Sequence, residues 1–298
     1  MIYYSQKNYD LYLMLIPAVV VIFIFNYIPI YGIQLAFREF VPDLGLTGGP
    51  WVGLKYINKF VTSFNFVDLI KNTVSISLTS IIIGFPIPIF LALIFNQIAK
   101  DKIKKTMQTV VYIPHFISTV VMVGILSVLL APNTGIAGSI FKNMGLDPVN
   151  FMGVPQYFIP IYVLSDIWQH AGWSSIIYIA ALSSIDVQLY DASKIDGANK
   201  MQTIWYIDIP SIMPTIIILL VLNMGNIMSV GFEKAYLMQN SLNLSASEVI
   251  STYVYKIGIQ SYQFSYAAAI NLFNNVINFL ILTSVNYFAK KTNDISLW

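Results

Sequence analysis

The sequence contains little charge and no cysteine. Of its 298 residues, 57% are hydrophobic and only 10% are charged, whereas soluble domains carry about 25% charged residues. The composition therefore indicates a protein of the lipid bilayer. The lack of cysteine excludes disulfides, thiolate metal sites and cysteine nucleophiles. A net charge of +2 gives no electrostatic reason to expect nucleic acid as a partner.

Long stretches of the chain lack any Asp, Glu, Lys or Arg. These uncharged runs cover residues 11–37, 72–99, 106–141, 209–232 and 257–289. Each exceeds the ~20 residues that a helix needs to cross a bilayer. A sixth apolar stretch, about 157–184, is broken only by Asp166. The runs lack the alternation of outer-membrane strands, so helices are the expected spanning form.

We therefore predict an all-α integral membrane protein with six transmembrane helices. The whole chain, residues 1–298, is expected to form a single transmembrane domain. The predicted spans cover residues 11–32, 69–96, 108–131, 157–182, 209–231 and 264–288.

The basic residues predict how these spans are oriented. Nine of the sixteen fall in the shorter segments of one face: Lys7, Lys100, Lys102, Lys104, Lys105, Lys194, Lys200, Lys290 and Lys291. The positive-inside rule makes that face cytoplasmic. We therefore expect a multi-pass protein of the cell membrane with both termini in the cytoplasm. The segments near 33–68, 132–156 and 232–263 are then expected to face outward.

Residues 190–214 (YDASKIDGANKMQTIWYIDIPSIMP) form a charged island between two apolar runs. Ser183, Ser184 and Asp186 are candidate caps for a helix that begins near Val187. Gly197 is expected to turn the chain, because glycine readily takes a positive φ. Such an island, at about residues 186–206, is typical of a docking element for a soluble protein.

A second short helix is predicted after the turn. Met201, Ile204 and Trp205 follow helical spacing and would form one apolar face. Tyr190 and Ile195 are candidates to anchor the first helix to the membrane domain. The plainer interpretation is an ordinary amphipathic loop between two spans.

The motif within this island favours the docking element. Tyr190-Asp191-Ala192-Ser193, Ile195-Asp196-Gly197-Ala198 and Ile207-Asp208-Ile209-Pro210 resemble the cytoplasmic coupling loop, or EAA motif, of ABC-importer permeases. Asp191 replaces the usual glutamate, and Ser193 replaces the second alanine. The resemblance implies an ATPase-coupling site made of Tyr190, Asp191, Ala192, Ser193, Ile195, Asp196, Gly197, Ala198 and Pro210.

Further segments extend this resemblance over most of the chain. They are Asn26–Gly32, Trp51–Leu54, Ile167–Trp168 with Gly172–Trp173, Tyr178–Leu182, Gly231–Tyr236 and Glu248–Tyr255. They look like the binding-protein-dependent, maltose-type permeases of carbohydrate uptake. The last two segments resemble the branch for complex oligosaccharides and polysaccharide fragments in Gram-positive bacteria.

The resemblance implies a division of labour among several chains. This chain would form half of a heterodimeric path with a second homologous permease, above two copies of a cytoplasmic ABC ATPase. An extracellular, lipid-anchored solute-binding protein would deliver the carbohydrate. The sequence contains no G-x-x-x-x-G-K-[ST] phosphate loop. We therefore expect a transport subunit and no enzyme, with no cofactor of its own and with ATP and Mg on the ATPase.

Polar residues within the predicted spans are candidates for the substrate path. Amides and aromatic rings suit a sugar, and polar groups in a bilayer are costly unless they face protein or water. The candidates are Trp168, Gln169, His170, Trp173, Asn223, Asn226, Asn271, Asn274, Asn275 and Asn278. The alternative for each asparagine is a contact between helices.

Asp166 and His170 are four residues apart and can pair on one helix face. A proton relay is the sharper interpretation of that pair. The predicted spans, however, contain a single carboxylate and the sequence only two histidines, which favours a structural role. Two other functions stay open: a stand-alone secondary carrier or channel for a small polar solute, and a membrane-embedded enzyme. The first predicts paired intramembrane charges and the second a catalytic constellation, and the spans offer little of either.

Overall fold

The computed structural model describes residues 9–293 and 295–297, and it is helical throughout that range apart from loops and two isolated β-bridges. Lys7 lies outside the described residues. The contacts cluster into two units, residues 1–66 with 254–273 and residues 67–253 with 274–298. Each unit is described by itself. The single-domain organisation stays a prediction.

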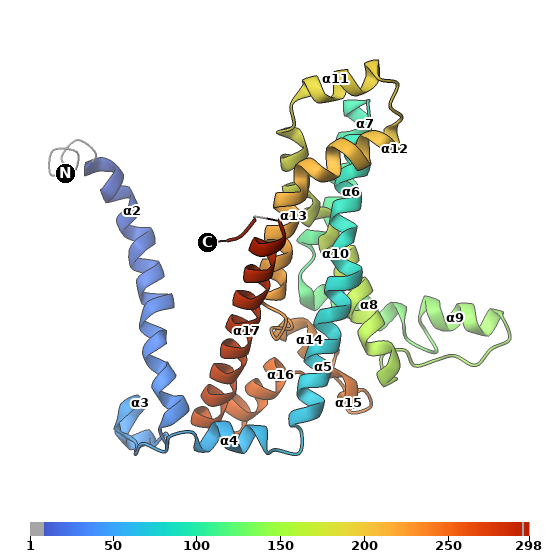
Figure 1. The fold of residues 1–298 in the computed structure, drawn as a ribbon. Helices are drawn as coiled ribbons and strands as arrows, with labels where there is room; N and C mark the ends of the chain where they lie inside the picture. Colours follow the sequence, from blue (N-terminus) through green and yellow to red (C-terminus); the bar gives the residue numbers. More distant parts are fainter. Residues whose placement is uncertain (1–8, 294, 298) are drawn as a thin grey trace. The chain divides into compact units, whose positions relative to one another are not determined.

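The first unit begins with a long apolar helix and continues into a short-helix segment (Figure 1). Residues Leu11–Phe37 form one candidate span. The elements of this unit are α2 (Tyr9–Ile22), a π-helical stretch (Phe23–Tyr27), 3-10 helices (Ile28–Phe37 and Pro42–Leu44), α3 (Gly45–Gly48), α4 (Lys55–Val61), a second π-helical stretch (Lys256–Gln260) and the start of α17 (Phe264–Asn293). Phe60 is fully buried and meets the rings of Phe66 and Phe273 edge-on.

The second unit holds the remaining helices. They are α5 (Phe66–Thr79), a π-helical stretch (Ser80–Gly84), α6 (Pro86–Asn96), α7 (Asp101–Tyr112), a 3-10 turn (Ile113–Phe116), α8 (Thr119–Leu129), α9 (Ile136–Asn143), α10 (Pro155–Ser183), α11 (Val187–Ile195), α12 (Lys200–Thr203), a π-helical stretch (Ile204–Asp208), α13 (Ile209–Met224), α14 (Phe232–Met238), α15 (Leu244–Ser247), α16 (Ile250–Tyr255) and the rest of α17.

Four helices of the described chain are long and apolar enough to cross a membrane: Leu11–Phe37, Phe66–Asn96, Lys200–Met224 and Phe264–Thr292. They cover the predicted first, second and sixth spans. The predicted fifth span, 209–231, is helical only as far as Met224, and residues 225–231 form a turn and loop before α14. The predicted third span, 108–131, is a pair of helices, Asp101–Phe116 and Thr119–Leu129, that bend by 95°. Pro114 and the cap at Ser118, which accepts from the Val121 amide, account for the break.

The predicted fourth span lies in α10, which has 29 residues. At a rise of about 1.5 Å per residue such a helix is roughly 43 Å long, more than a hydrocarbon core of about 30 Å. Helix α10 is not one of the four candidate spans of the described residues, because its polar side chains lower its mean hydropathy. This polarity distinguishes α10 from the other predicted spans.

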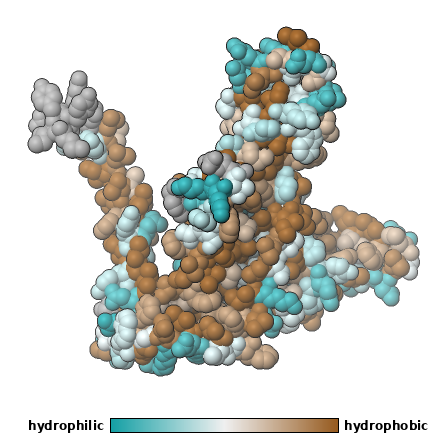
Figure 2. Space-filling model, viewed as in Figure 1, coloured by the Kyte–Doolittle hydropathy of each residue, from teal (hydrophilic) through white to brown (hydrophobic). Residues whose placement is uncertain are grey.

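Two hydrophobic clusters hold the second unit together. One joins Tyr178 and Leu182 of α10 with Leu93 of α6 and Ile212 of α13. The other surrounds Phe158 and Tyr162 at the opposite end of α10, so α10 runs through both. In Figure 2, hydrophobic surface covers the middle helices of this unit and hydrophilic surface gathers over α11 and α12.

Candidate functional site

The predicted coupling loop is a helix, a tight turn and a return into α13 (Figure 1). Helix α11 begins at Val187, as predicted, and the Asp186 carboxylate caps it by accepting from the Gln188 amide at 2.9 Å. Ser183 and Ser184 were wrongly expected to share this role. Their hydroxyls donate back to carbonyls of α10, because serine at a helix end readily bonds the preceding turn.

Gly197 turns the chain as predicted, with φ at 75°. The Ala198 amide donates to the Ser193 carbonyl at 2.9 Å, and the Gly197 amide donates to the Lys194 carbonyl at 3.1 Å. These two bonds are the Schellman motif that closes many helices. The turn is therefore built from backbone bonds that need glycine's conformational freedom.

The second short helix is not a separate element, in contrast to the prediction. Helix α12 begins with a capping box between Asn199 and Gln202. The chain then stays helical through the π-helical stretch into α13, so residues Lys200–Met224 form one candidate span. Pro210 has no amide hydrogen to donate, and it lies directly after the π-helical stretch Ile204–Asp208, where the helical hydrogen-bonding pattern already changes.

The predicted apolar face of that segment does form. Met201, Ile204 and Trp205 line a groove of about 710 Å³ together with Phe90 and Leu93 of α6. The helical segment that follows the turn therefore lies beside α6, which belongs to a candidate membrane span.

The tip of the loop is exposed. Ile195 is 86% exposed, so it does not anchor α11 to the membrane domain as predicted. Asp191 forms a solvent-exposed ion pair with Lys194 at 3.1 Å, and such pairs add little stability. Ala192 and Asp196 are exposed as well. The loop therefore offers an apolar side chain and charges to a partner.

Tyr190 is the residue that does anchor α11. Its hydroxyl donates to the buried carboxylate of Asp208 at 2.6 Å. The same carboxylate accepts from Asn96 at 3.3 Å and from Gln97 at 3.0 Å, at the end of α6. Burial, together with the bond to Asp208, raises the pKa of Tyr190 to about 12, so its hydroxyl keeps its proton at physiological pH.

Two cavities lie beside α10, inside the second unit. The larger, of about 450 Å³, is lined by polar and aromatic side chains that include Ser80, Asp166, His170, Trp173 and Asn223. The smaller, of about 270 Å³, shares Ser80, Asp166 and Asn223 with it and adds Asn226. Apolar side chains such as Ile81 also line both cavities, so together they form a partly polar region within a membrane protein, large enough for part of a sugar chain.

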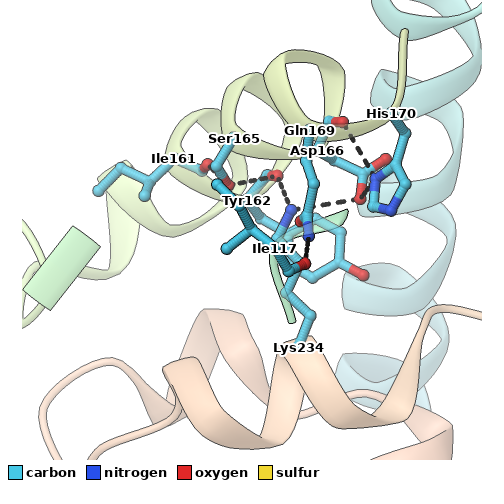
Figure 3. Close-up of polar contacts among 8 residues, drawn as sticks. All are labelled: Ile117, Ile161, Tyr162, Ser165, Asp166, Gln169, His170 and Lys234. Carbon is cyan, nitrogen blue, oxygen red and sulfur yellow. Dashed lines mark hydrogen bonds and ion pairs between the residues drawn. The ribbon is translucent and has the colours of Figure 1, made fainter. Parts of the chain in front are cut away.

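Asp166 and His170 pair as predicted, at 3.3 Å (Figure 3). A third titratable side chain joins them: the buried Lys234 amine lies 3.2 Å from Asp166 and donates to the Tyr162 carbonyl at 3.0 Å. Lys234 also lies 4.7 Å from the centre of the Tyr162 ring. A buried lysine is costly unless paired, and here a carboxylate, a carbonyl and a ring face compensate it.

Gln169 and Trp173 of α10 contact the break in the predicted third span. The buried amide of Gln169 donates at 2.7 Å to the carbonyl of Ile117, which the break frees from helical pairing (Figure 3). The Trp173 ring stacks on His115, with ring centres 4.6 Å apart. Trp168 is 54% exposed and lies outside the lining of the two cavities.

The asparagines of α17 do not act as one stripe. Asn274 and Asn278 are buried, whereas Asn271 and Asn275 are exposed. Asn278 accepts from the Met228 amide and donates to the Ser229 hydroxyl, so it fastens the segment that follows α13. Asn223 and Asn226 donate to carbonyls of their own helix and still line the cavities.

Sequence reasoning missed Lys234 and the burial of Asp208. Lys234 lies 68 positions from its carboxylate partner, and no local pattern joins two such residues. The available signals were single charges: Lys234 lies two residues after an uncharged run, and Asp208 directly precedes one.

The bundle, its polar cavities and the exposed loop define the membrane subunit of a transporter. The family described as "Binding-protein-dependent transport system inner membrane component" matches residues 84–294. This chain belongs to that family and is therefore a multi-pass membrane permease rather than an enzyme.

Similar proteins are found among both sequences and solved structures. The polygalacturonan/rhamnogalacturonan transport system permease YteP of Bacillus subtilis is 39% identical over 98% of this chain and 91% of its own length. The protein LplB of Bacillus subtilis is 36% identical over 98% of this chain and 92% of its own. A bacterial ABC transporter involved in import of the acidic polysaccharide alginate superposes with a TM-score of 0.88 at 38% identity, covering 97% of this chain and 98% of that one.

Proposed function

We propose that this permease forms half of the membrane path of an ATP-driven importer for fragments of a polysaccharide. The observation that carries the proposal is the rigid loop of α11 and Gly197, whose exposed tip is separate from the cavities beside α10. A loop of this kind suits an ATPase partner, and a polar cavity suits a saccharide. ATP and Mg would be held by that ATPase.

The assembly that we propose contains four further chains. They are a second homologous permease, two copies of a cytoplasmic ABC ATPase and an extracellular, lipid-anchored binding protein. One solved bacterial alginate ABC transporter is in complex with an alginate pentasaccharide-bound periplasmic protein, and its chain matches 98% of this one. We propose that both termini lie in the cytoplasm, as the positive-inside rule predicts. We also propose that the protein belongs to the membrane of a Gram-positive bacterium, because two close relatives come from Bacillus.

The names of the relatives support a substrate class. YteP is named for polygalacturonan and rhamnogalacturonan, and the solved transporter imports alginate. We therefore propose acidic oligosaccharides as the first candidates. The donors that line the larger cavity, namely His170, Asn223 and the Trp173 indole, support a saccharide because they can pair with hydroxyl and carboxylate oxygens.

Copurification and uptake test the proposal together. The tagged chain is purified in mild detergent, and mass spectrometry is expected to identify an ATPase with a phosphate-loop motif and a second permease. The complex is then reconstituted in vesicles with the binding protein and supplied with labelled oligogalacturonide or malto-oligosaccharide. We expect ATP-dependent uptake of the acidic probe. Recovery of the chain alone, with uptake that ignores ATP, would instead support a secondary carrier.

A further inference from the structure

Asp208 is fully buried although it belongs to the charged island of residues 190–214. A buried carboxylate is unfavourable unless its oxygens accept hydrogen bonds. Here one oxygen accepts from Tyr190 and Asn96, and the other accepts from Gln97. The network satisfies the carboxylate, and its donors come from α11 and from the end of α6.

These donors connect three separate parts of the second unit. Tyr190 lies in the middle of α11, whereas Asn96 and Gln97 lie at the end of α6. Asp208 itself ends the π-helical stretch and directly precedes α13. Stretches of π-helix are rare and often mark functional sites. A single carboxylate thus joins the exposed loop to two candidate membrane spans.

We propose that Asp208 is a positioning residue for coupling, which makes α6 and α13 follow any displacement of α11. This inference rests on the proposed function, because it assumes that an ATPase moves the loop. Without Asp208, α11 would be connected to the bundle only by the chain at its two ends and by contacts weaker than the hydrogen bond between Tyr190 and Asp208. The loop could then move while the spans stayed in place.

The chemistry of the network favours a carboxylate at position 208. The bond from Tyr190, at 2.6 Å, has the length of a charge-assisted O–H···O⁻ bond. Three donors meet two oxygens, and a carboxylate can accept all of them. An asparagine at position 208 would place an N–H group against one of those donors. Only a flip of the Gln97 side-chain amide, which would present its oxygen as an acceptor, could relieve this mismatch.

Tyr190→Phe separates coupling from folding. This change removes the link to α11 and leaves Asp208 with Asn96 and Gln97, so α6 and α13 stay joined. Tyr206→Phe is the matched control, because Tyr206 lies in the same loop and is 78% exposed. Asp208→Asn weakens the whole network.

The readout is the ratio of saccharide imported to ATP hydrolysed, measured on the complete complex in vesicles with labelled oligogalacturonide. We expect Tyr190→Phe to lower that ratio by roughly tenfold or more, as for the loss of a hydrogen bond to a charged group. Hydrolysis should persist, Tyr206→Phe should match the wild type, and Asp208→Asn should lower the ratio as well.

Spin labels give a second readout, because the chain has no native cysteine. Cysteines replace the exposed Ile195 in the loop and the exposed Phe90 in α6. In the wild-type background we expect ATP to change both label spectra. In the Tyr190→Phe background we expect a change only at position 195.

The inference is overturned if Tyr190→Phe keeps the wild-type ratio, or if both labels still respond to ATP in that variant. Equal losses in Tyr206→Phe and Tyr190→Phe would also overturn it. A wild-type complex without an ATPase or ATP-dependent uptake would overturn the proposed function itself, and the inference with it.

Discussion

Substitution of Gly197 tests whether the geometry of the loop sets the efficiency of transport. A Cβ atom at this position would meet nothing within 4 Å, so a side chain has room. The backbone, however, has a φ of 75°, which L-residues rarely adopt. A substitution therefore acts on the backbone conformation and not through a clash.

The size of the effect follows from that conformation. An L-residue in the left-handed region costs about 1–2 kcal/mol, and asparagine is among the residues that tolerate it. Because about 1.4 kcal/mol is a factor of ten, the population of correctly closed loop should fall roughly 5- to 30-fold for Gly197→Val. The Schellman bonds to Ser193 and Lys194 would open in the remaining molecules.

The assay compares Gly197→Val with Gly197→Asn in reconstituted complexes. We expect the valine variant to hydrolyse ATP with much lower uptake of labelled oligogalacturonide, and the asparagine variant to recover most of the uptake. The thermal unfolding temperature in detergent should change little, since the turn is exposed. Normal uptake by Gly197→Val, or equal defects in both variants, would refute the reasoning.

Two further predictions concern the packing and the charges around α10. Gly172→Ala should strongly lower the thermal unfolding temperature, because its Cβ would lie 2.2 Å from the Val111 carbonyl oxygen and such overpacking costs about 1–3 kcal/mol or more. Gly84→Ala should be tolerated, because its Cβ would make only ordinary van der Waals contact with Ile167, at 3.5 Å. Asp166→Ala should destabilise more than Lys234→Met, since it leaves a buried lysine without its carboxylate; the cost should be below the roughly 3–5 kcal/mol of a fully buried pair, because the Asp166 side chain is 42% exposed. Equal unfolding temperatures within either pair of variants would contradict these expectations.

Much of the fold follows from local pattern. The uncharged runs predict the helices because a bilayer requires long apolar segments with internal hydrogen bonds. Likewise, Asp186 before Val187, and Gly197 after α11, carry the start and stop signals of that helix within a few residues. The pairing of Asp166 with His170 was predictable for the same reason, because four residues make about one turn.

Interactions between distant segments could not be predicted in this way. The four asparagines of α17 have helical spacing, yet only Asn274 and Asn278 are buried. Which side of the stripe faces protein depends on the segment around Met228, and that segment lies about 50 positions away. The polar path likewise gains Ser80 from a π-helical stretch that no simple apolar pattern marks.

Asp208 shows why the position of a charge does not reveal its exposure. A carboxylate at the border of an apolar run is expected at the membrane surface, in water. Asn96 and Gln97, at the end of another run, supply donors at the same level, because neighbouring antiparallel spans bring their ends together. Tyr190 adds a third donor. With three hydrogen bonds to its oxygens, the Asp208 carboxylate costs less free energy to bury than an unpaired carboxylate would. Polar residues at the borders of two spans therefore identify candidate junctions, and a coupling helix that contributes a donor to such a junction is mechanically joined to both spans.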